Sequence, residues 1–223
     1  MKMAQRSGSL RLKVWGENAC FTRPEMKVER VSYDVMTPSA ARGILEAILW
    51  KPAMCWQIEQ IDVLCPIRWE SVRRNEVGAQ MSGRANELFI EDHRQQRAGL
   101  FLRNVAYTVH AHFEMTEKAG PADNVVKFQE MFLRRAEKGQ CFHRPYLGCR
   151  EFSAYFEPLR DERCLPQPIT ETRELGWMLF DIRHDGQADG SHVHSCTEGC
   201  HPSFFKAKME NGRIDLRNIE VRS

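Results

Sequence analysis

The chain has 223 residues, a hydrophobic fraction of 42% and a formal net charge of +2, so it is long and apolar enough to form a folded core. No run of about 18 apolar residues occurs, so no transmembrane helix is expected. The opening MKMAQRSGSLRLKVWG lacks the apolar block of a signal peptide. We therefore expect a cytoplasmic protein that has no membrane partner.

The first part of the chain predicts a strand followed by a well-marked helix. Residues 10–15 alternate apolar and basic side chains, which is typical of a half-buried strand. Thr37 can cap a helix that starts at Pro38, and apolar residues then recur at helical spacing as far as Trp50. Pro52 prevents the helix from continuing.

The middle of the chain predicts two more strands with a projection between them. Residues 56–64 alternate apolar and polar side chains, and residues 105–113 do so more clearly. The polar face of the second strand carries Thr108, His110, His112 and Glu114. Residues 71–97 are rich in Arg, Asn, Gln and Gly and only weakly periodic, so we expect a projecting hairpin or a mobile loop there.

The last third predicts a second helix and further strands. The helix should begin near Asp123 or Asn124 and end at Gly139, a residue that favours helix termination. Strand signals return at 150–156 and 175–182. The stretch between them, 157–173, is Pro-rich and charged, which suggests a boundary.

The order strand, helix, strand, strand, helix, strand predicts an α+β fold. It matches a ferredoxin-like (RRM-type) domain over residues 1–157, in which helices cover one face of an antiparallel sheet. A small antiparallel β domain would follow over residues 158–223. This fold serves many functions, and one of them is holding RNA on the open face of the sheet.

Basic residues gather in short segments that also contain aromatic residues or glycine. These segments are RVSYDV, SVRRNEV, HRQQRAG, FLRRAEKG and FHRPYLGCRE. Such clusters suit the phosphates of a nucleic acid, with aromatic rings available for base stacking. The alternative for each cluster is an ordinary solvated surface.

Four longer stretches carry a resemblance to a known family. They are RLKVWGENACFTRPEMKVERVSYDVMTPSAARGILEAILWKP, RRNEVG, RQQRAGLFLRNVAYTVHAHFE and GQCFHRPYLGCREF, with weaker matches at LGWMLFDI and FFKAKMENG. Together they resemble the type I-C (Dvulg) branch of the CRISPR-associated Cas-five family. The resemblance implies an RRM-type domain with a β-hairpin thumb and a small C-terminal β domain.

The resemblance also implies partners and an antiviral role. Members of this family sit in the Cascade surveillance complex and bind the repeat-derived 5′ handle of CRISPR RNA. The implied partners are this handle and the backbone and large subunits of Cascade, with target DNA contacted only indirectly. A free RNA-binding protein of the same fold, outside any complex, remains the weaker alternative.

In type I-C systems this subunit also cuts precursor RNA without a metal or other cofactor, leaving a 2′,3′-cyclic phosphate. The family places a Tyr or His in an xWKP context and a Lys-His pair in an N-x-G-K-H context. In this sequence those positions fall on Leu49, Lys127 and Phe128. Leu and Phe cannot transfer protons, so we expect cleavage to be lost or weak.

An active endoribonuclease that uses other residues is the alternative. The candidate replacements are His110, His112, His143 and Tyr146. The candidate RNA-binding residues are Phe21, Arg23, Arg73, Arg74, Lys127, His143, Arg144, Tyr146 and Arg150.

A dense group of soft ligands lies near the C-terminus, in DGSHVHSCTEGCHPSFF. It consists of His192, His194, Cys196, Cys200 and His201. Five such residues can supply the four ligands of a structural zinc ion, although the spacing is not that of a common zinc finger. The alternative is an exposed loop rich in Gly and His that holds no metal.

Overall fold

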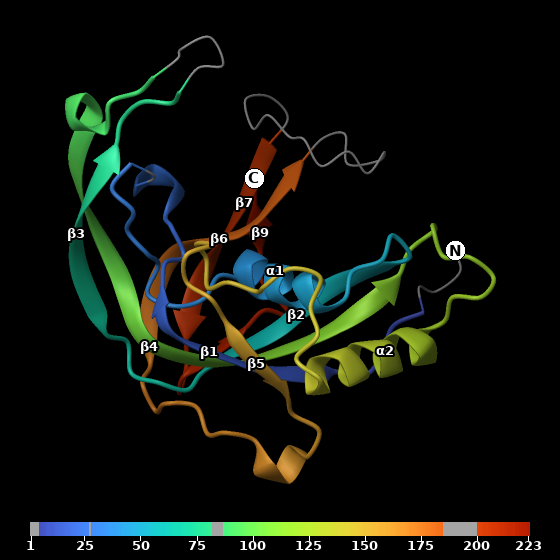
Figure 1. Ribbon diagram of the computed structural model, residues 1–223. Coiled ribbons are helices and arrows are strands. Elements are labelled where there is room, and N and C mark those ends of the chain that lie inside the picture. Colours follow the sequence, from blue (N-terminus) through green and yellow to red (C-terminus); the bar gives the residue numbers. More distant parts are fainter. Residues whose placement is uncertain (1–4, 27, 82–86, 185–199) are drawn as a thin grey trace.

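The computed structural model describes residues 5–26, 28–81, 87–184 and 200–223 (Figure 1). The α-helices are α1 (Pro38–Ile48) and α2 (Val125–Glu137), and the short 3-10 helices are η1 (Pro24–Met26), η2 (Ile90–His93) and η3 (Glu162–Cys164). The strands are β1 (Leu10–Ala19), β2 (Met54–Val63), β3 (Trp69–Val77), β4 (Arg94–Met115), β5 (Tyr155–Pro158), β6 (Arg173–His184), β7 (Cys200–Met209), β8 (Arg213–Asp215) and β9 (Val221–Arg222). In the described part of the chain, no helix is both long and apolar enough to cross a membrane.

The main sheet has six strands in the order β5-β1-β4-β2-β8, with β3 paired to β4, and every pairing is antiparallel. Without β3 and β8, the elements run β1-α1-β2-β4-α2-β5, which is the order of a ferredoxin-like domain. Buried residues of both helices, such as Ile44 and Phe132, belong to the same core as Leu12 and Val109 of the sheet. The predicted α+β architecture is confirmed.

Both helices begin where the sequence predicts. The Thr37 side chain accepts a hydrogen bond from the Ala40 N–H, and the Asn124 side chain accepts one from the Lys127 N–H. Each cap satisfies a backbone donor that has no partner within the helix. Gly139 follows α2 with a φ of 63°, the left-handed conformation that glycine tolerates best.

The projection is a β-hairpin, which we call the thumb (residues 69–81 and 87–102). β3 pairs with the first half of β4, from Trp69 opposite Leu102 to Val77 opposite Arg94, and the hairpin extends away from the rest of the sheet (Figure 1). β4 is therefore 22 residues long and starts at Arg94, so the strand that the sequence predicts from residue 105 is too short. The thumb strands do not show the apolar–polar alternation that predicts a strand, because β3 exposes one face and only half buries the other.

One strand prediction was wrong in its extent. Residues 150–154 form a turn, and only Tyr155–Pro158 (β5) pairs with β1. The turn is closed by hydrogen bonds from the Leu147 N–H to the Phe152 carbonyl and from the Phe152 N–H to the Cys149 carbonyl. These local bonds use backbone groups that a longer strand would need for pairing. Gly148 has a left-handed φ of 85°, which also turns the chain away from an extended conformation.

The C-terminal segment builds a second, three-stranded sheet in the order β6-β7-β9. Its buried Met178 and Phe205 belong to the same core as α1, and β8 returns to pair with β2 of the main sheet. The two sheets therefore share one hydrophobic core. The division into domains at residue 157 stays a prediction.

Candidate nucleic-acid interface

Leu49 lies directly after α1 and is buried, with 1% of its surface exposed. Its N–H donates to the Leu45 carbonyl, and its own carbonyl accepts a hydrogen bond of 2.9 Å from the Trp56 indole. The helix end is thus held by backbone bonds and apolar packing. The side chain offers no group for proton transfer.

Phe128 and Lys127 are neighbours in the first turn of α2 but face different surroundings. Phe128 is 2% exposed, and its ring centroid lies 6.4 Å from that of Phe113 in the core. Lys127 is exposed, and its Nζ lies 3.3 Å from Asp123 Oδ1. A hydrogen bond from the Gly120 N–H, the bond from Lys127 and the charge of Lys51 lower the pKa of Asp123. Lys127 therefore lies at the surface, where its ammonium group is bonded to Asp123 and to the Ala122 carbonyl.

The segment between α2 and β5, which we call the α2–β5 loop (residues 138–154), carries four of the predicted RNA contacts. His143, Arg144 and Arg150 are exposed, and Tyr146 is half-buried. The His143 and Tyr146 ring centroids are 6.3 Å apart, and the Arg144 guanidinium lies 5.7 Å from the Tyr155 ring centroid. Basic and aromatic groups thus alternate along one surface loop.

Two hydrogen bonds seat this loop on the rest of the molecule. The Cys20 N–H at the end of β1 donates to the Leu147 carbonyl at 3.0 Å, and the Phe142 N–H donates to the Ala47 carbonyl of α1 at 2.7 Å. The loop is therefore held on both β1 and α1. Lys127 stands at the opposite end of α2 from this loop.

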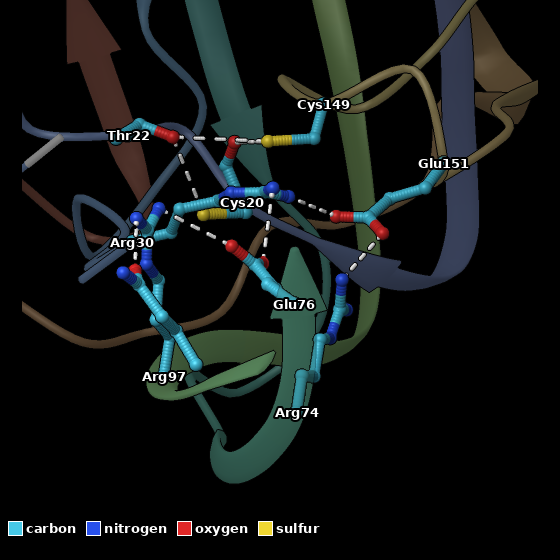
Figure 2. A network of polar contacts seen from close by, with 9 residues as sticks. Cys20, Thr22, Arg30, Arg74, Glu76, Arg97, Cys149 and Glu151 are labelled. Atoms are coloured by element: carbon cyan, nitrogen blue, oxygen red, sulfur yellow. Dashed lines mark hydrogen bonds and ion pairs between the residues drawn. The ribbon is translucent and has the colours of Figure 1, made fainter. Parts of the chain in front are cut away.

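A network of ion pairs, which we call the thumb-base network, joins the thumb to this loop (Figure 2). Glu151 of the loop accepts from Arg74 of β3 and, at 2.7 Å, from Arg30. Glu76 of β3 accepts from Arg30 and Arg97, both at 3.3 Å. These pairs connect three segments that are far apart in the sequence.

The two predicted phosphate contacts on β3 differ in their surroundings. Besides its pairing with Glu151, the Arg74 guanidinium stacks 4.7 Å from the Phe101 ring centroid. Arg73 lies on the other face of β3 and is exposed. Arg73 is thus the more accessible of the two.

Phe21 and Arg23 lie at the end of β1 and are also engaged by the fold. Phe21 is 2% exposed and meets Tyr107 edge-on, with ring centroids 6.1 Å apart. The Arg23 guanidinium lies 4.5 Å from the Tyr33 ring centroid and pairs with Asp34 at 3.3 Å. Phe21 is thus part of the core, and the Arg23 guanidinium is held by groups of the fold.

The strand histidines form carboxylate pairs on the sheet face away from the helices. His110 Nε2 lies 2.9 Å from Asp62 Oδ2, and His112 Nδ1 lies 2.9 Å from Glu59 Oε1. Burial raises the pKa of Glu59, but the hydrogen bonds from Ser9 and His112 outweigh it and the net shift is downward. A ring nitrogen of each imidazole therefore has a hydrogen-bond partner within the protein, as is usual for a half-buried His that serves a structural role.

Sequence reasoning missed a pair of cysteines beside the thumb-base network (Figure 2). The Thr22 hydroxyl lies 3.5 Å from Cys20 Sγ and 3.7 Å from Cys149 Sγ. A hydrogen bond from Cys20 lowers the pKa of Cys149 to about 6, helped by Thr22 and Arg30 and opposed by burial. No spacing rule links two cysteines 129 positions apart, so only the fold reveals the pair.

The predicted metal cluster falls largely outside the described residues. His192, His194 and Cys196 lie in the segment that the structure does not describe, while Cys200 and His201 open β7. Among the residues that are described, no three His, Cys, Asp or Glu side chains gather in a way that would hold a metal. A zinc site there stays a prediction.

The architecture is that of an α+β protein with a ferredoxin-like element order, a projecting hairpin and a basic, aromatic loop at its base. The chain belongs to the Cas5 family of CRISPR-associated proteins, because the family model for Cas5d matches residues 9–217. This confirms the family and branch that the sequence motifs indicated.

Two relatives support this membership. The CRISPR pre-crRNA endoribonuclease Cas5d of Mannheimia succiniciproducens is 52% identical over 93% of this chain and 94% of its own length. The protein of the same name from Thermus thermophilus is 51% identical over 93% of this chain and 90% of its own length.

Solved structures confirm the fold at lower sequence identity. A crystal structure described as a CRISPR-associated protein is 21% identical, has a TM-score of 0.70 and covers 99% of both chains. A functionally uncharacterized protein from Streptococcus mutans is 21% identical, has a TM-score of 0.68, and covers 98% of this chain and 99% of its own. At this identity the likeness shows the fold alone.

Proposed function

We propose that the chain is a CRISPR RNA-binding subunit of a type I-C Cascade complex, where it binds and caps the 5′ handle of the RNA. Family membership and the names of the two close relatives, both given as acting on pre-crRNA, support this role. So does the α2–β5 loop, whose exposed Arg144 and Arg150 and half-buried Tyr146 suit phosphates and unpaired bases. The proposed partners include the backbone and large subunits of Cascade, with target DNA contacted only through the complex, and the proposed location is the cytoplasm.

We further propose that cleavage of precursor RNA is lost or weak in this chain. This proposal rests on the burial of two apolar side chains, Leu49 and Phe128, which are 1% and 2% exposed. Cleavage needs a base to take the 2′-hydroxyl proton and an acid to protonate the leaving 5′-oxygen. Neither position offers such a group, whereas Lys127 is still able to neutralise phosphate charge.

The second candidate is an active metal-independent endoribonuclease that uses other residues. It is favoured by the two relatives named as pre-crRNA endoribonucleases at about half identity. His143 and Tyr146 are the best-placed replacements, since one is exposed and the other half-buried on the same loop. In that case His143→Ala would abolish cutting even at protein concentrations that saturate the RNA, because any loss of its predicted RNA contact is then compensated.

Binding is tested by fluorescence anisotropy with a CRISPR repeat hairpin RNA over a range of salt concentrations. Each phosphate contact adds about one unit to the slope of log affinity against log salt, so Arg144→Ala with Arg150→Ala should lower the slope by about two. Arg163→Ala is the matched control, because this side chain is 91% exposed on η3, outside the loop. An unchanged slope in the double variant would show that the loop is ordinary surface.

A further inference from the structure

A cavity of about 270 Å³ opens beside the first turns of α1. Its walls come from the end of β1, the first two turns of α1, the α2–β5 loop and Leu179 of β6. It therefore lies where the ferredoxin-like part meets the C-terminal sheet. Of the residues named above as candidates for cleavage, Tyr146 lines it, whereas Leu49, Lys127, Phe128 and His143 do not.

The α2–β5 loop can form one wall because of a glycine. A Cβ at Gly148 would lie 2.0 Å from the Cys20 carbonyl oxygen, and the φ of this residue is +85°. Any larger residue would push the loop away from β1 and open the wall. The loop that carries the basic residues is thus also the loop that shapes the cavity.

The lining identifies the kind of ligand. Thr22 and Ser39 offer hydroxyls, Tyr146 offers a half-buried aromatic ring, and the described residues that line the cavity include no charged side chain. A site without charge suits a neutral, flat and polar group better than a phosphate. The volume lies just below the range of about 300–1,000 Å³ for whole small-molecule sites, which fits a single ring system.

We propose that this cavity receives one unpaired nucleobase of the bound RNA. The inference rests on the proposed RNA-binding function and adds a site of base recognition to it. The phosphates on either side of that base would meet Arg144 and Arg150, which are exposed on the same loop as Tyr146. Recognition of RNA through bases that leave the stack and enter a pocket is common among RNA-binding folds.

Gly43 offers a way to fill the cavity without disturbing the fold. Ser39, Ala40 and Gly43 line it from one face of α1, and a Cβ at Gly43 would meet no atom within 4 Å. Ala and Leu both have high helix propensity, so Gly43→Ala and Gly43→Leu should both fold. They differ in how much of the cavity they occupy.

The test measures how tightly each protein binds a CRISPR repeat RNA and a set of the same RNA with one abasic nucleotide at each position in turn. Gly43→Leu should weaken binding of the intact RNA about 10-fold to 100-fold, and Gly43→Ala by less than about 3-fold. In the unaltered protein one abasic position should cost a similar factor. That position should become neutral in Gly43→Leu.

The outcomes separate this inference from the proposed function. If the unaltered protein binds the RNA but no abasic position depends on residue 43, the base site is wrong and the binding role stands. If the repeat RNA binds no better than an unrelated hairpin, both are wrong.

Ser39→Ala leaves the cavity open and removes one hydroxyl, so it should reduce discrimination among the four bases at the sensitive position. Unchanged discrimination in a folded Ser39→Ala protein, with unchanged affinity in Gly43→Leu, would overturn the base site.

Discussion

Leu49 and Phe128 occupy the two positions where the family resemblance implies proton-transferring groups, and both are part of the core. The sequence predicted that they lack the chemistry, because Leu and Phe are apolar and fit the buried stripe of their helices. The structure adds that neither side chain reaches solvent. Restoring Tyr and His there would therefore bury polar groups as well as change the packing.

The structural role of Phe128 can be measured directly. Phe128→Ala should lower the free energy of unfolding by about 3–5 kcal/mol, because it removes a buried ring that packs near Phe113. Val126→Ala is the matched control in the same helix turn, since Val126 is 64% exposed and should change stability by less than about 0.5 kcal/mol. Urea denaturation checks both, and equal effects would contradict the buried position of Phe128.

Cys149 should react as a thiolate near neutral pH. Because its pKa is lowered to about 6, the thiolate fraction rises as pH increases through 6. Alkylation by iodoacetamide, followed by peptide mass spectrometry, should therefore show a rate midpoint near pH 6 in the folded protein. In urea the midpoint should move to about 8.5, the ordinary value for cysteine.

Cys20 provides the control for that measurement. Its hydrogen bond is the largest cause of the lowered pKa, so Cys20→Ala should raise the pKa of Cys149 and move the alkylation midpoint to higher pH. A folded-state midpoint above pH 8 in the unaltered protein would contradict the described arrangement of Cys20, Thr22 and Cys149.

Adjacent arginines on β3 give a test of how the thumb is attached. Arg74→Ala should lower the free energy of unfolding by about 1–2 kcal/mol, because Arg74 stacks on Phe101 and pairs with Glu151. Arg73→Ala should cost less than about 0.5 kcal/mol, since Arg73 is exposed on the other face of the strand. Thermal or urea unfolding checks both variants, and equal effects would contradict the thumb-base network.

Helix α1 contains an unusual weak point at Gly43. Glycine in a helix interior is less favourable than alanine by about 0.5–1 kcal/mol, and a Cβ here would meet no neighbour. Gly43→Ala should therefore raise the free energy of unfolding by that amount. A loss of stability on urea denaturation would show that the space beside Gly43 is smaller than described.

Helix starts were the part of the secondary structure that the sequence predicted best, whereas α1 ends at Ile48, before the predicted end at Trp50. Thr37 and Asn124 cap helices as expected because capping depends on side chains next to the helix itself. The thumb strands and the turn at 150–154 were harder to predict. Their geometry depends on pairing with distant segments and on a left-handed glycine, neither of which produces a hydrophobic period.

The candidate site was predictable only in part for the same reason. Short motifs located Lys127 and the α2–β5 loop, since those residues are close together in the sequence. The pairing of Arg74 with Glu151 and the cysteine pair required the fold, because their partners come from distant segments. The cavity beside α1 likewise draws its walls from four separate segments of the chain.

One hydrophobic core joins the two sheets of the molecule. This core therefore also supports the surface on which we place the RNA. Met178 and Phe205 of the C-terminal sheet share that core with α1, and Arg42 of α1 pairs with Asp181 of β6 at 2.7 Å. The cavity lies at this junction. The C-terminal segment thus contributes directly to the surface on which we place the RNA.

We expect this protein to bind CRISPR RNA without cutting it efficiently. The most direct measurement incubates the purified chain with a repeat hairpin RNA in EDTA, with the Mannheimia succiniciproducens relative as positive control. The RNA bound by this chain should stay full length while the relative releases product. Cutting by the unaltered chain at a rate comparable to the relative, with a 2′,3′-cyclic phosphate on the product, would show that this protein is an active endoribonuclease. Residues other than Leu49 and Phe128 would then carry the reaction.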